Sequence, residues 1–343
     1  MTPQYHPFLA NGPSGDPVVY VAFRFSKRAI LFDLGDITAL PVKKILRITD
    51  VFVSHMHVDH LIGFDHLLRV LIGRARRVRL FGPEGLIAAI GHKLAAYSWN
   101  LAHRVPGNLT FIVTETAEDG TSRRAEFRLA DRFRASGEST FPLDGDIVHA
   151  EEALTVRRAS LDHGIPSIAY ALQERSHVNL WKNRLDALGL GTGPWLNELK
   201  AAALRGDPDD RIIRAAWKTP GGVAERNLPL GLLRRECLRF EPGQKIAYVT
   251  DARHTQENQR RIVALARDAD LLFIETTFAA GEDALALERG HLTAGQAGRL
   301  ARRAGARRAE PMHISPRYAG VEDQILAQFA RAFAGQETPS AGA

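Results

Sequence analysis

Three histidines and one aspartate lie within six residues of one another, directly after an apolar run at 50–54 that is typical of a buried strand. They are His55, His57, Asp59 and His60. In an extended segment the imidazoles of His55 and His57 point to one side, while Asp59 and His60 follow a turn later and can reach a second ion. Mixed imidazole and carboxylate ligands favour zinc, with manganese or iron as alternatives. The group therefore predicts a metal site.

The position of this group also predicts its chemistry. Ligands of α/β proteins gather beyond the carboxyl ends of strands. Two ions held about 3.5–4 Å apart lower the pKa of a bridging water and stabilise the attacking and leaving oxygens of a displacement. A single histidine at a strand end is more often structural, so this interpretation depends on the whole group. We expect a metal-dependent hydrolase with two ions per chain.

The elements that must position these ligands follow from short apolar runs that alternate with helical patterns. Strands are predicted over 18–23, 29–32, 50–54, 78–81, 245–250 and 271–275, and helices over 85–98, 256–268 and 292–304. Thr293 and Gln296 fit a capping box at the start of the last helix. Pro311 cannot donate to a strand ladder, so we expect an edge strand or a shortened strand there. The alternation is typical of an α/β protein with covered sheets.

Composition and charge limit the class of protein. The 343 residues are 45% hydrophobic, which is enough for a sizeable core, and the formal net charge is +6. Arginines cluster at 74–79, 234–235, 302–303 and 307–308. This surplus suits a polyanionic partner, although arginines also gather by chance on solvated helix faces. Cys237 is the single cysteine, and no apolar run approaches the roughly 20 residues that cross a bilayer, so we expect a cytoplasmic protein without a membrane segment.

The pattern weakens between 174 and 227, where glycines and prolines interrupt it repeatedly. We interpret this segment as an insertion in one domain that spans 1–334. Loop regions of this length are usually functional or disordered. The tail at 335–343 is small and polar, and we expect it to be flexible.

The motif His-x-His-x-Asp-His at 55–60 resembles the signature of the metallo-β-lactamase superfamily. Segments 161–170, 248–253 and 312–318 resemble the downstream ligand motifs of its ribonuclease Z branch. The resemblance implies a four-layer αββα sandwich with zinc ions at two sites. It also implies that His163 completes the first site with His55 and His57, that Asp251 bridges the ions, and that His313 joins Asp59 and His60 on the second ion.

Two further segments resemble motifs of the same branch. They are Glu275-Thr276-Thr277-Phe278 and the run at 290–297, which begins Gly-His-Leu-Thr. The family histidine of the second motif is catalytic, so the resemblance implies that His291 protonates the leaving 3′-oxygen of RNA. Asp59 would orient and deprotonate the attacking water. The alternative is that His291 only contacts backbone at the start of a helix.

The insertion carries a Gly-Pro-rich run at 188–200 that resembles the exosite arm with which ribonuclease Z grips tRNA. Backbone amides freed by glycines, together with nearby lysines and arginines, can contact phosphates. The resemblance thus implies a tRNA 3′-processing endonuclease that acts on a tRNA precursor and forms a homodimer. A generic mobile loop is the alternative for this run.

The first fifty residues depart from the family, because only a Phe-Asp-x-Gly core at 32–35 matches its usual segments. Two other functions therefore stay open. One is hydrolysis of a small phosphodiester, sulfate ester or lactone, which parallel assays with precursor tRNA and a small diester would distinguish. The other is a metal-free binding protein, which metal analysis would reveal.

Overall fold

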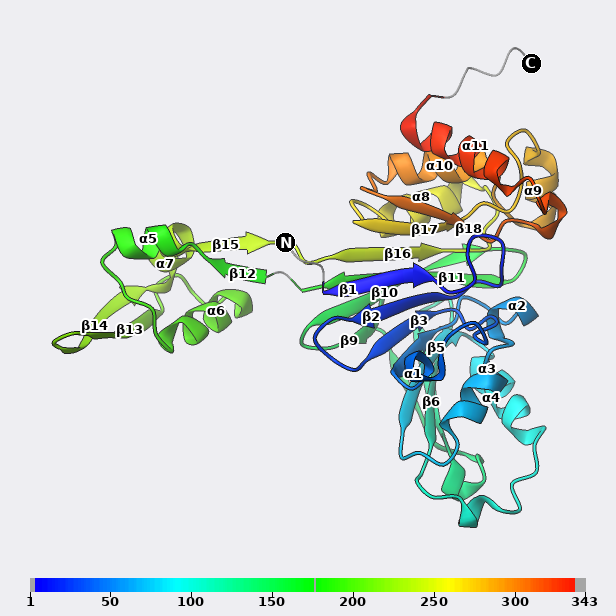
Figure 1. The fold of residues 1–343 in the computed structure, drawn as a ribbon, viewed down its shortest axis with the longest axis horizontal. Coiled ribbons are helices and arrows are strands. Elements are labelled where there is room, and N and C mark those ends of the chain that lie inside the picture. Colours follow the sequence, from blue (N-terminus) through cyan, green and yellow to red (C-terminus); the bar gives the residue numbers. More distant parts are fainter. Residues whose placement is uncertain (1–3, 176, 337–343) are drawn as a thin grey trace. The chain divides into compact units, whose positions relative to one another are not determined.

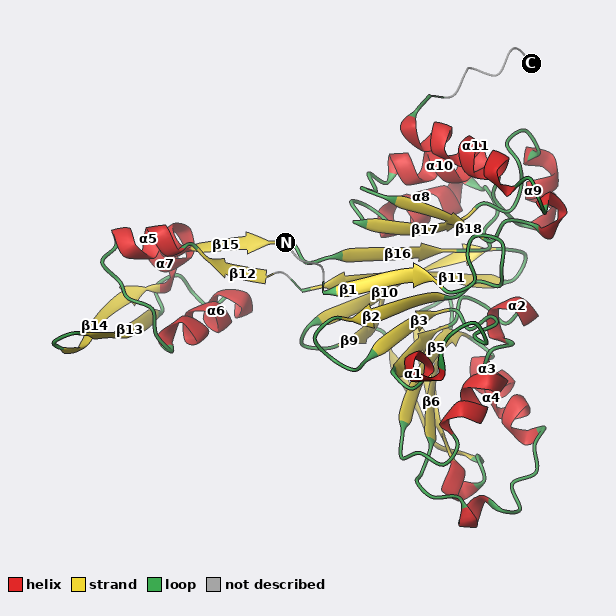
Figure 2. Cartoon of the chain, viewed as in Figure 1, coloured by secondary structure: helices red, strands yellow, loops and turns green. Residues whose placement is uncertain are grey.

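The computed structural model describes residues 4–175 and 177–336, which fall into two compact units. The first consists of Met1–Gln173 with Gln244–Ala343, and the second is Glu174–Gly243. Figure 1 follows the chain through both, and Figure 2 distinguishes their helices and strands. The tail predicted at 335–343 lies outside the described residues from position 337 onward.

Two mixed β-sheets form the centre of the first unit. Sheet 1 has eight strands in chain order, β1 (Tyr5–Leu9), β2 (Val19–Phe23), β3 (Ala29–Phe32), β4 (Ile48–Phe52), β5 (Arg77–Pro83), β6 (Thr110–Thr116), β7 (Thr121–Arg128) and β8 (Ala135–Pro142). Sheet 2 has six, in the order β18 (Ala309–Met312), β17 (Leu271–Glu275), β16 (Lys245–Val249), β11 (Pro166–Glu174), β10 (Leu154–Asp162) and β9 (Ile147–Ala150). The neighbours β3 to β6 run parallel, as do β16 to β18.

Side chains that point alternately to the two faces of each strand fill the space between the two sheets. In β3, Ile30 and Phe32 belong to the cluster shared by both sheets, whereas Ala29 and Leu31 face the outer cluster. Phe32 stacks on Tyr248 of β16 with ring centroids 5.6 Å apart. All four residues of β3 are buried, which explains why the run is apolar throughout rather than alternating.

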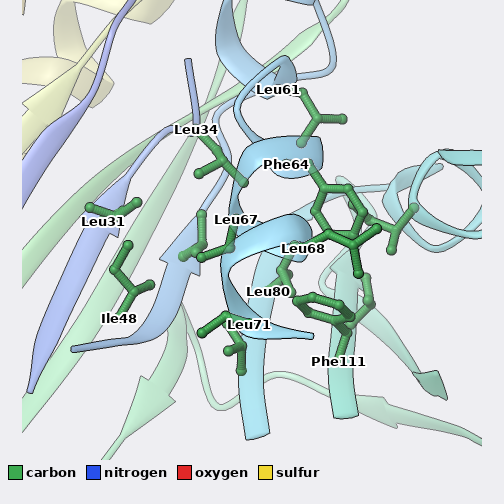
Figure 3. Packing of buried hydrophobic residues seen from close by; sticks show 14 of the residues in the cluster. Leu31, Leu34, Ile48, Leu61, Phe64, Leu67, Leu68, Leu71, Leu80 and Phe111 are labelled. Atoms are coloured by element: carbon green, nitrogen blue, oxygen red, sulfur yellow. The ribbon is translucent and has the colours of Figure 1, made fainter. Parts of the chain in front are cut away.

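Helices cover the outer face of each sheet. Helices α1 (Val42–Ile45), α2 (Val58–Leu61), α3 (Phe64–Leu71) and α4 (Leu86–Ala95) accompany sheet 1, and Figure 3 shows Phe64 and the leucines of α3 beside residues of its strands. Helices α8 (Gln256–Leu265), α9 (Asp283–Arg289), α10 (Ala294–Arg303) and α11 (Glu322–Ala334) accompany sheet 2 (Figure 1). The four-layer αββα sandwich is therefore confirmed. Among the described residues, no helix has the length and apolar character needed to cross a membrane.

Several local predictions are confirmed at the level of single residues. Strand β17 has the predicted bounds, and the capping box of Thr293 and Gln296 is formed at the start of α10. Strand β18 contains Pro311, is four residues long and lies at the edge of sheet 2, as its missing N–H requires. Strand β4 is Ile48–Phe52, so it begins and ends two residues earlier than the predicted 50–54, although the N–H of Val53 still donates to the carbonyl of Phe81.

The second unit has a core of its own. Its elements are β12 (His177–Leu180), α5 (Lys182–Ala187), α6 (Trp195–Arg205), β13 (Ile212–Thr219), β14 (Gly222–Pro229), α7 (Leu230–Cys237) and β15 (Leu238–Glu241). Buried Leu185, Leu199, Ile213 and Cys237 pack together. The unit extends past residue 227 because α7 completes this core and β15 pairs with β12. Gly206 ends α6 at a φ of 71°, where a left-handed residue is needed.

A network of charged side chains around the buried Asp50 ties the two sheets together, separate from the seven predicted metal ligands. Asp50 of β4 is fully buried and accepts hydrogen bonds of 2.5 Å from both Arg28 and Arg79. Both arginines also donate to Glu151, which follows β9, and His149 lies 2.9 Å from the same carboxylate. Burial opposes ionisation, but the hydrogen bonds from the arginines hold the pKa of Glu151 down at about 2. The network is thus charged and paired at neutral pH.

We expect Asp50→Asn to lower the free energy of unfolding by about 1.5–3 kcal/mol, because hydrogen bonds to charged groups contribute roughly that much. Urea unfolding followed by circular dichroism measures the change. Glu257→Gln is the control, since Glu257 pairs with Arg260 and Arg261 on an exposed helix face and should matter little. An unchanged midpoint for Asp50→Asn would contradict the stabilising role of the network.

Candidate metal centre

The seven predicted ligand positions come from four separate segments, each of which follows the end of a strand. His55 and His57 lie in the loop after β4, Asp59 and His60 in the adjoining helix α2, His163 after β10, Asp251 after β16 and His313 after β18. The structure brings all seven together at one edge of the sandwich. This is where α/β folds usually gather ligands.

The side chains form two groups that meet at Asp251. The ligand atoms of His55, His57, His163 and Asp251 all lie within 4.8 Å of one another, as do those of Asp59, His60 and His313. Asp251 Oδ2 lies 3.5 Å from the Nε2 atoms of both His55 and His60, and 3.4 Å from that of His163. Its other oxygen lies 3.0 Å from Nδ1 of His313. The Asp251 carboxylate therefore faces both groups.

Unpaired nitrogens show that these groups fit a cation. Within 4–175 and 177–336, three buried imidazole nitrogens have no hydrogen-bond partner: Nε2 of His55, Nε2 of His60 and Nδ1 of His313. Asp251 is close to Nδ1 of His313 but is not in hydrogen-bond geometry with it. An unsatisfied buried polar atom costs about 1–3 kcal/mol. Burial, with the neighbouring His60, lowers the pKa of His55 to about 2, so its imidazole is neutral and its lone pair is available. Neutral imidazole is the form that binds metals.

The electrostatics of the second group also favour a cation. Burial acts to lower the pKa of His60, but the carboxylates of Asp251 and Asp33 raise it overall. The same negative charge would stabilise a metal ion at this position. The fold and the two clusters together indicate a metal site in this protein.

Residues outside the predicted set fix the orientation of the imidazoles. Asp33 Oδ2 lies 2.7 Å from Nδ1 of His60 and accepts a 2.6 Å hydrogen bond from the Tyr248 hydroxyl. Ser54 Oγ lies 3.0 Å from Nδ1 of His55, and the carbonyl of Gly290 lies 2.7 Å from Nδ1 of His163. Such partners leave Nε2 directed at the metal and select the tautomer. In the sequence Asp33 is part of the Phe-Asp-x-Gly motif at 32–35, and nothing in that motif predicts its contact with His60.

His291 is held beside the two groups by a buried carboxylate. Its Nδ1 lies 2.9 Å from Oε2 of Glu275, whose other oxygen accepts a 2.6 Å hydrogen bond from the backbone of Ala252. Burial lowers the pKa of His291, but Glu275 raises it overall. The ring centroids of His291 and His163 are 4.8 Å apart. His291 can therefore carry a proton next to the site, although the atoms of Asp251, Glu275, His291 and His313 are also close enough to bind an ion.

Five of the predicted ligands, His57, Asp59, His163, Asp251 and His313, line one cavity of about 730 Å³ together with His291. Besides the ligands and His291, its wall includes residues from the first fifty positions and from the segments around α9 and β18, namely Ser14, Gly15, Asp16, Phe278, Leu285, Arg289, Ser315 and Arg317. The divergent first fifty residues thus contribute to the site through Ser14–Asp16 and Asp33.

We expect Asp33→Asn to weaken metal binding about 10- to 100-fold, because a partner that orients a ligating histidine usually contributes that much. Asparagine keeps the shape of the side chain and tolerates the left-handed backbone of position 33, where φ is 57°. Metal retained during titration with a chelator measures the affinity. Asp65→Asn, which removes an ion pair with Lys93 on the helical surface, is the control. Equal retention by both variants would remove Asp33 from the metal centre.

Comparisons with known proteins agree with this geometry. The family described as beta-lactamase superfamily domain matches residues 224–314. Ribonuclease Z of Deinococcus radiodurans is 31% identical over 312 residues, which cover 89% of this chain and 88% of the relative. Ribonuclease Z of Thermobifida fusca is also 31% identical, and the match covers 91% of this chain and 83% of that relative.

Solved structures share the fold at lower identity. The metallo-beta-lactamase fold protein YhfI of Bacillus subtilis is 14% identical with a TM-score of 0.52, and the match covers 94% of this chain and 91% of that one. The short form of human tRNase Z is 19% identical with a TM-score of 0.50, covering 92% and 93% respectively. These likenesses show a common architecture.

Proposed function

The chain belongs to the ribonuclease Z family of the metallo-β-lactamase superfamily, and from this premise we propose that it is a zinc-dependent endoribonuclease that cleaves precursor tRNA at the 3′ end. The observation that carries the proposal is the meeting of two metal-ligand groups at Asp251, with the His291–Glu275 pair beside them. The ligand groups would hold the metal ions for phosphodiester hydrolysis, and the His291–Glu275 pair would supply a proton to the leaving oxygen.

The donor set suits two zinc ions, with manganese or iron as alternatives. His55, His57 and His163 would hold the first ion, Asp59, His60 and His313 the second, and Asp251 would contact both. When bound, such a pair lowers the pKa of a water and stabilises charge on the phosphoryl oxygens.

The remaining steps belong to side chains of this protein. Asp59 is 41% exposed at the cavity, so its carboxylate can orient the attacking water and accept its proton. The new bond joins the water oxygen to phosphorus, and the bond from phosphorus to the 3′-oxygen breaks. His291, oriented by Glu275, donates a proton to that leaving oxygen. The products are an RNA with a 3′-hydroxyl and a fragment with a 5′-phosphate.

Zinc-loaded wild-type protein should contain close to two ions per chain by elemental analysis. His291→Ala should keep that content and lose turnover by about 10²–10⁴-fold, the usual contribution of a general acid. His313→Ala should instead lose metal. His92→Ala, on the exposed face of α4, serves as the control. Metal loss from His291→Ala would make His291 a ligand, and a wild-type content of one ion would remove the two-metal mechanism.

Two features of the second unit support an RNA substrate. Residues 174–243 contain 12 lysines and arginines against 9 aspartates and glutamates, so the unit carries a positive surplus that suits phosphates. Trp181 is 53% exposed, and the guanidinium of Arg184 lies 5.4 Å from its ring centroid. Exposed aromatic rings and arginines are surfaces on which bases stack. We therefore assign tRNA contacts to this unit, in the role of an exosite.

The proposal extends to assembly and compartment. Family resemblance supports a homodimer in which the exosite of one subunit serves the other. Cys237 is buried and is the single cysteine of the sequence, so no internal disulfide can form, which suits the cytoplasm.

The pairing of β12 with β15 allows most of the second unit to be replaced by a short turn. Leu180 of β12 pairs directly with Leu238 of β15, so an Asn-Gly turn in place of 181–237 would close the two strands as a hairpin. We expect kcat/KM for precursor tRNA to fall steeply, because remote phosphate contacts provide binding and positioning energy. Hydrolysis of a small diester and the metal content should persist.

Two outcomes of this replacement would contradict the exosite role. One is unchanged cleavage of precursor tRNA. The other is loss of both activities while the metals and the fold are intact. Either would favour a hydrolase of a small phosphodiester, sulfate ester or lactone.

A further inference from the structure

Two arginines from separate elements lie on the wall of the cavity that also holds His291. Arg289 is the last residue of α9, and Arg317 lies in the 3₁₀ turn Pro316–Tyr318 that follows β18. Their side chains are 66% and 49% exposed. Arg289 Nε lies 4.0 Å from Glu288, and Arg317 Nη1 lies 3.8 Å from Glu282. Both distances exceed a hydrogen bond, so these carboxylates leave the guanidinium donors available.

The surrounding structure holds Arg317 in place without neutralising it. Its guanidinium lies 5.9 Å from the ring centroid of Phe278 and 5.8 Å from that of Tyr318. Oε2 of Glu282 accepts hydrogen bonds from the Tyr318 hydroxyl and from the backbone of Ala279, and its Oε1 is the oxygen that faces Arg317. The ring of Phe278 is in turn 5.9 Å from that of His291. Arg317 therefore lies on the His291 side of the cavity.

Arg289 is placed on the same side by the turn that leads to His291. Gly290 between them has a φ of 81°, and a Cβ there would lie 2.8 Å from Nδ1 of His163. The turn thus packs tightly against the metal centre. The start of α9 is also anchored, because Asp283 accepts 3.0 Å hydrogen bonds from Thr293 and Gln296. The α9 segment is a fixed wall that presents Arg289.

The Ser14–Asp16 loop also lines the cavity, and the residue before it, Pro13, accepts a 2.9 Å hydrogen bond from the backbone N–H of Ile314. The carboxylate of Asp16 would repel a phosphate. Among the residues that line the cavity, Arg289 and Arg317 carry the permanent positive charges, so they are the groups that favour one.

We propose that Arg289 and Arg317 bind the phosphate immediately 5′ of the one that is cleaved. This inference depends on the proposed function. In an in-line displacement the attacking and leaving oxygens lie on opposite sides of phosphorus, and His291 marks the leaving side. The leaving 3′-oxygen belongs to a ribose whose own 5′-phosphate is the next anion along the RNA. Guanidinium groups match phosphate oxygens with paired hydrogen bonds.

The test uses zinc-loaded full-length protein and two precursor tRNAs. One is unmodified, and the other carries an uncharged methylphosphonate at the linkage immediately 5′ of the cleavage site. For wild-type protein, kcat/KM should be lower on the modified RNA by on the order of 10- to 100-fold. The double variant Arg289→Gln/Arg317→Gln should show a similar loss on unmodified RNA and little further loss on the modified one.

Controls separate this contact from other effects. Arg260→Gln removes a 71% exposed arginine from α8 and should keep the full sensitivity to methylphosphonate. Arg317→Lys keeps the charge and should retain part of that sensitivity if packing on Phe278 is undisturbed. Metal content is measured for every variant, and a variant that loses metal is replaced by the corresponding lysine variant.

Two results would overturn the inference. Wild-type protein that cleaves both RNAs equally makes no contact with that phosphate. If the loss caused by the double variant adds to the loss caused by the methylphosphonate, the arginines act elsewhere. If the fully metallated wild-type protein cleaves neither RNA, the proposed function itself is wrong, and this inference is rejected with it.

Discussion

The carboxylate of Asp251 is the constraint on which the rest of the site depends. It is 2% exposed and lies within 3.5 Å of nitrogens from His55, His60, His163 and His313. A buried carboxylate is costly unless positive charge surrounds it. His55 and His60 follow a strand of sheet 1, whereas His163 and His313 follow strands of sheet 2. The charge of Asp251 is therefore compensated only when both sheets are folded and packed together. The sandwich therefore positions the two groups of candidate ligands around one buried carboxylate.

Backbone strain gathers at the same place. Asp33, Asp251 and His313 each have φ between 45° and 57°, a left-handed conformation that costs on the order of 1–3 kcal/mol for residues other than glycine. All three follow strands and turn their side chains toward the metal centre. From there a second buried carboxylate continues the network, because Glu275 contacts both the backbone of Ala252 and the ring of His291. One side chain thus fixes the ring of His291 relative to the candidate ligands.

Short-range patterns were enough to predict much of this arrangement, whereas long-range contacts were not. The capping box of α10 is local and is formed as predicted, and the motif from His55 to His60 is local and contributes to both groups of candidate ligands. The partner of His60 is 27 residues away in sequence and that of His291 is 16 away, so spacing alone gave Asp33 and Glu275 no role. Strands β7 and β8 were missed because their exposed faces carry charged and polar residues. The second unit was interpreted only as an insertion, without elements of its own, because glycines and prolines interrupt its patterns.

The arginine clusters of the sequence show why net charge is a poor guide to recognition. In the structure Arg79 pairs with Asp50, Arg234 with Asp209 and Arg307 with Asp270. Each of these arginines is paired with a nearby carboxylate, so ordinary surface and packing roles explain them. Arg289 and Arg317 belong to no cluster, are 28 residues apart in the sequence and line the same cavity. Recognition of a phosphate depends on guanidinium groups that share one cavity and are not hydrogen-bonded to a carboxylate, and proximity along the chain neither produces nor predicts that arrangement.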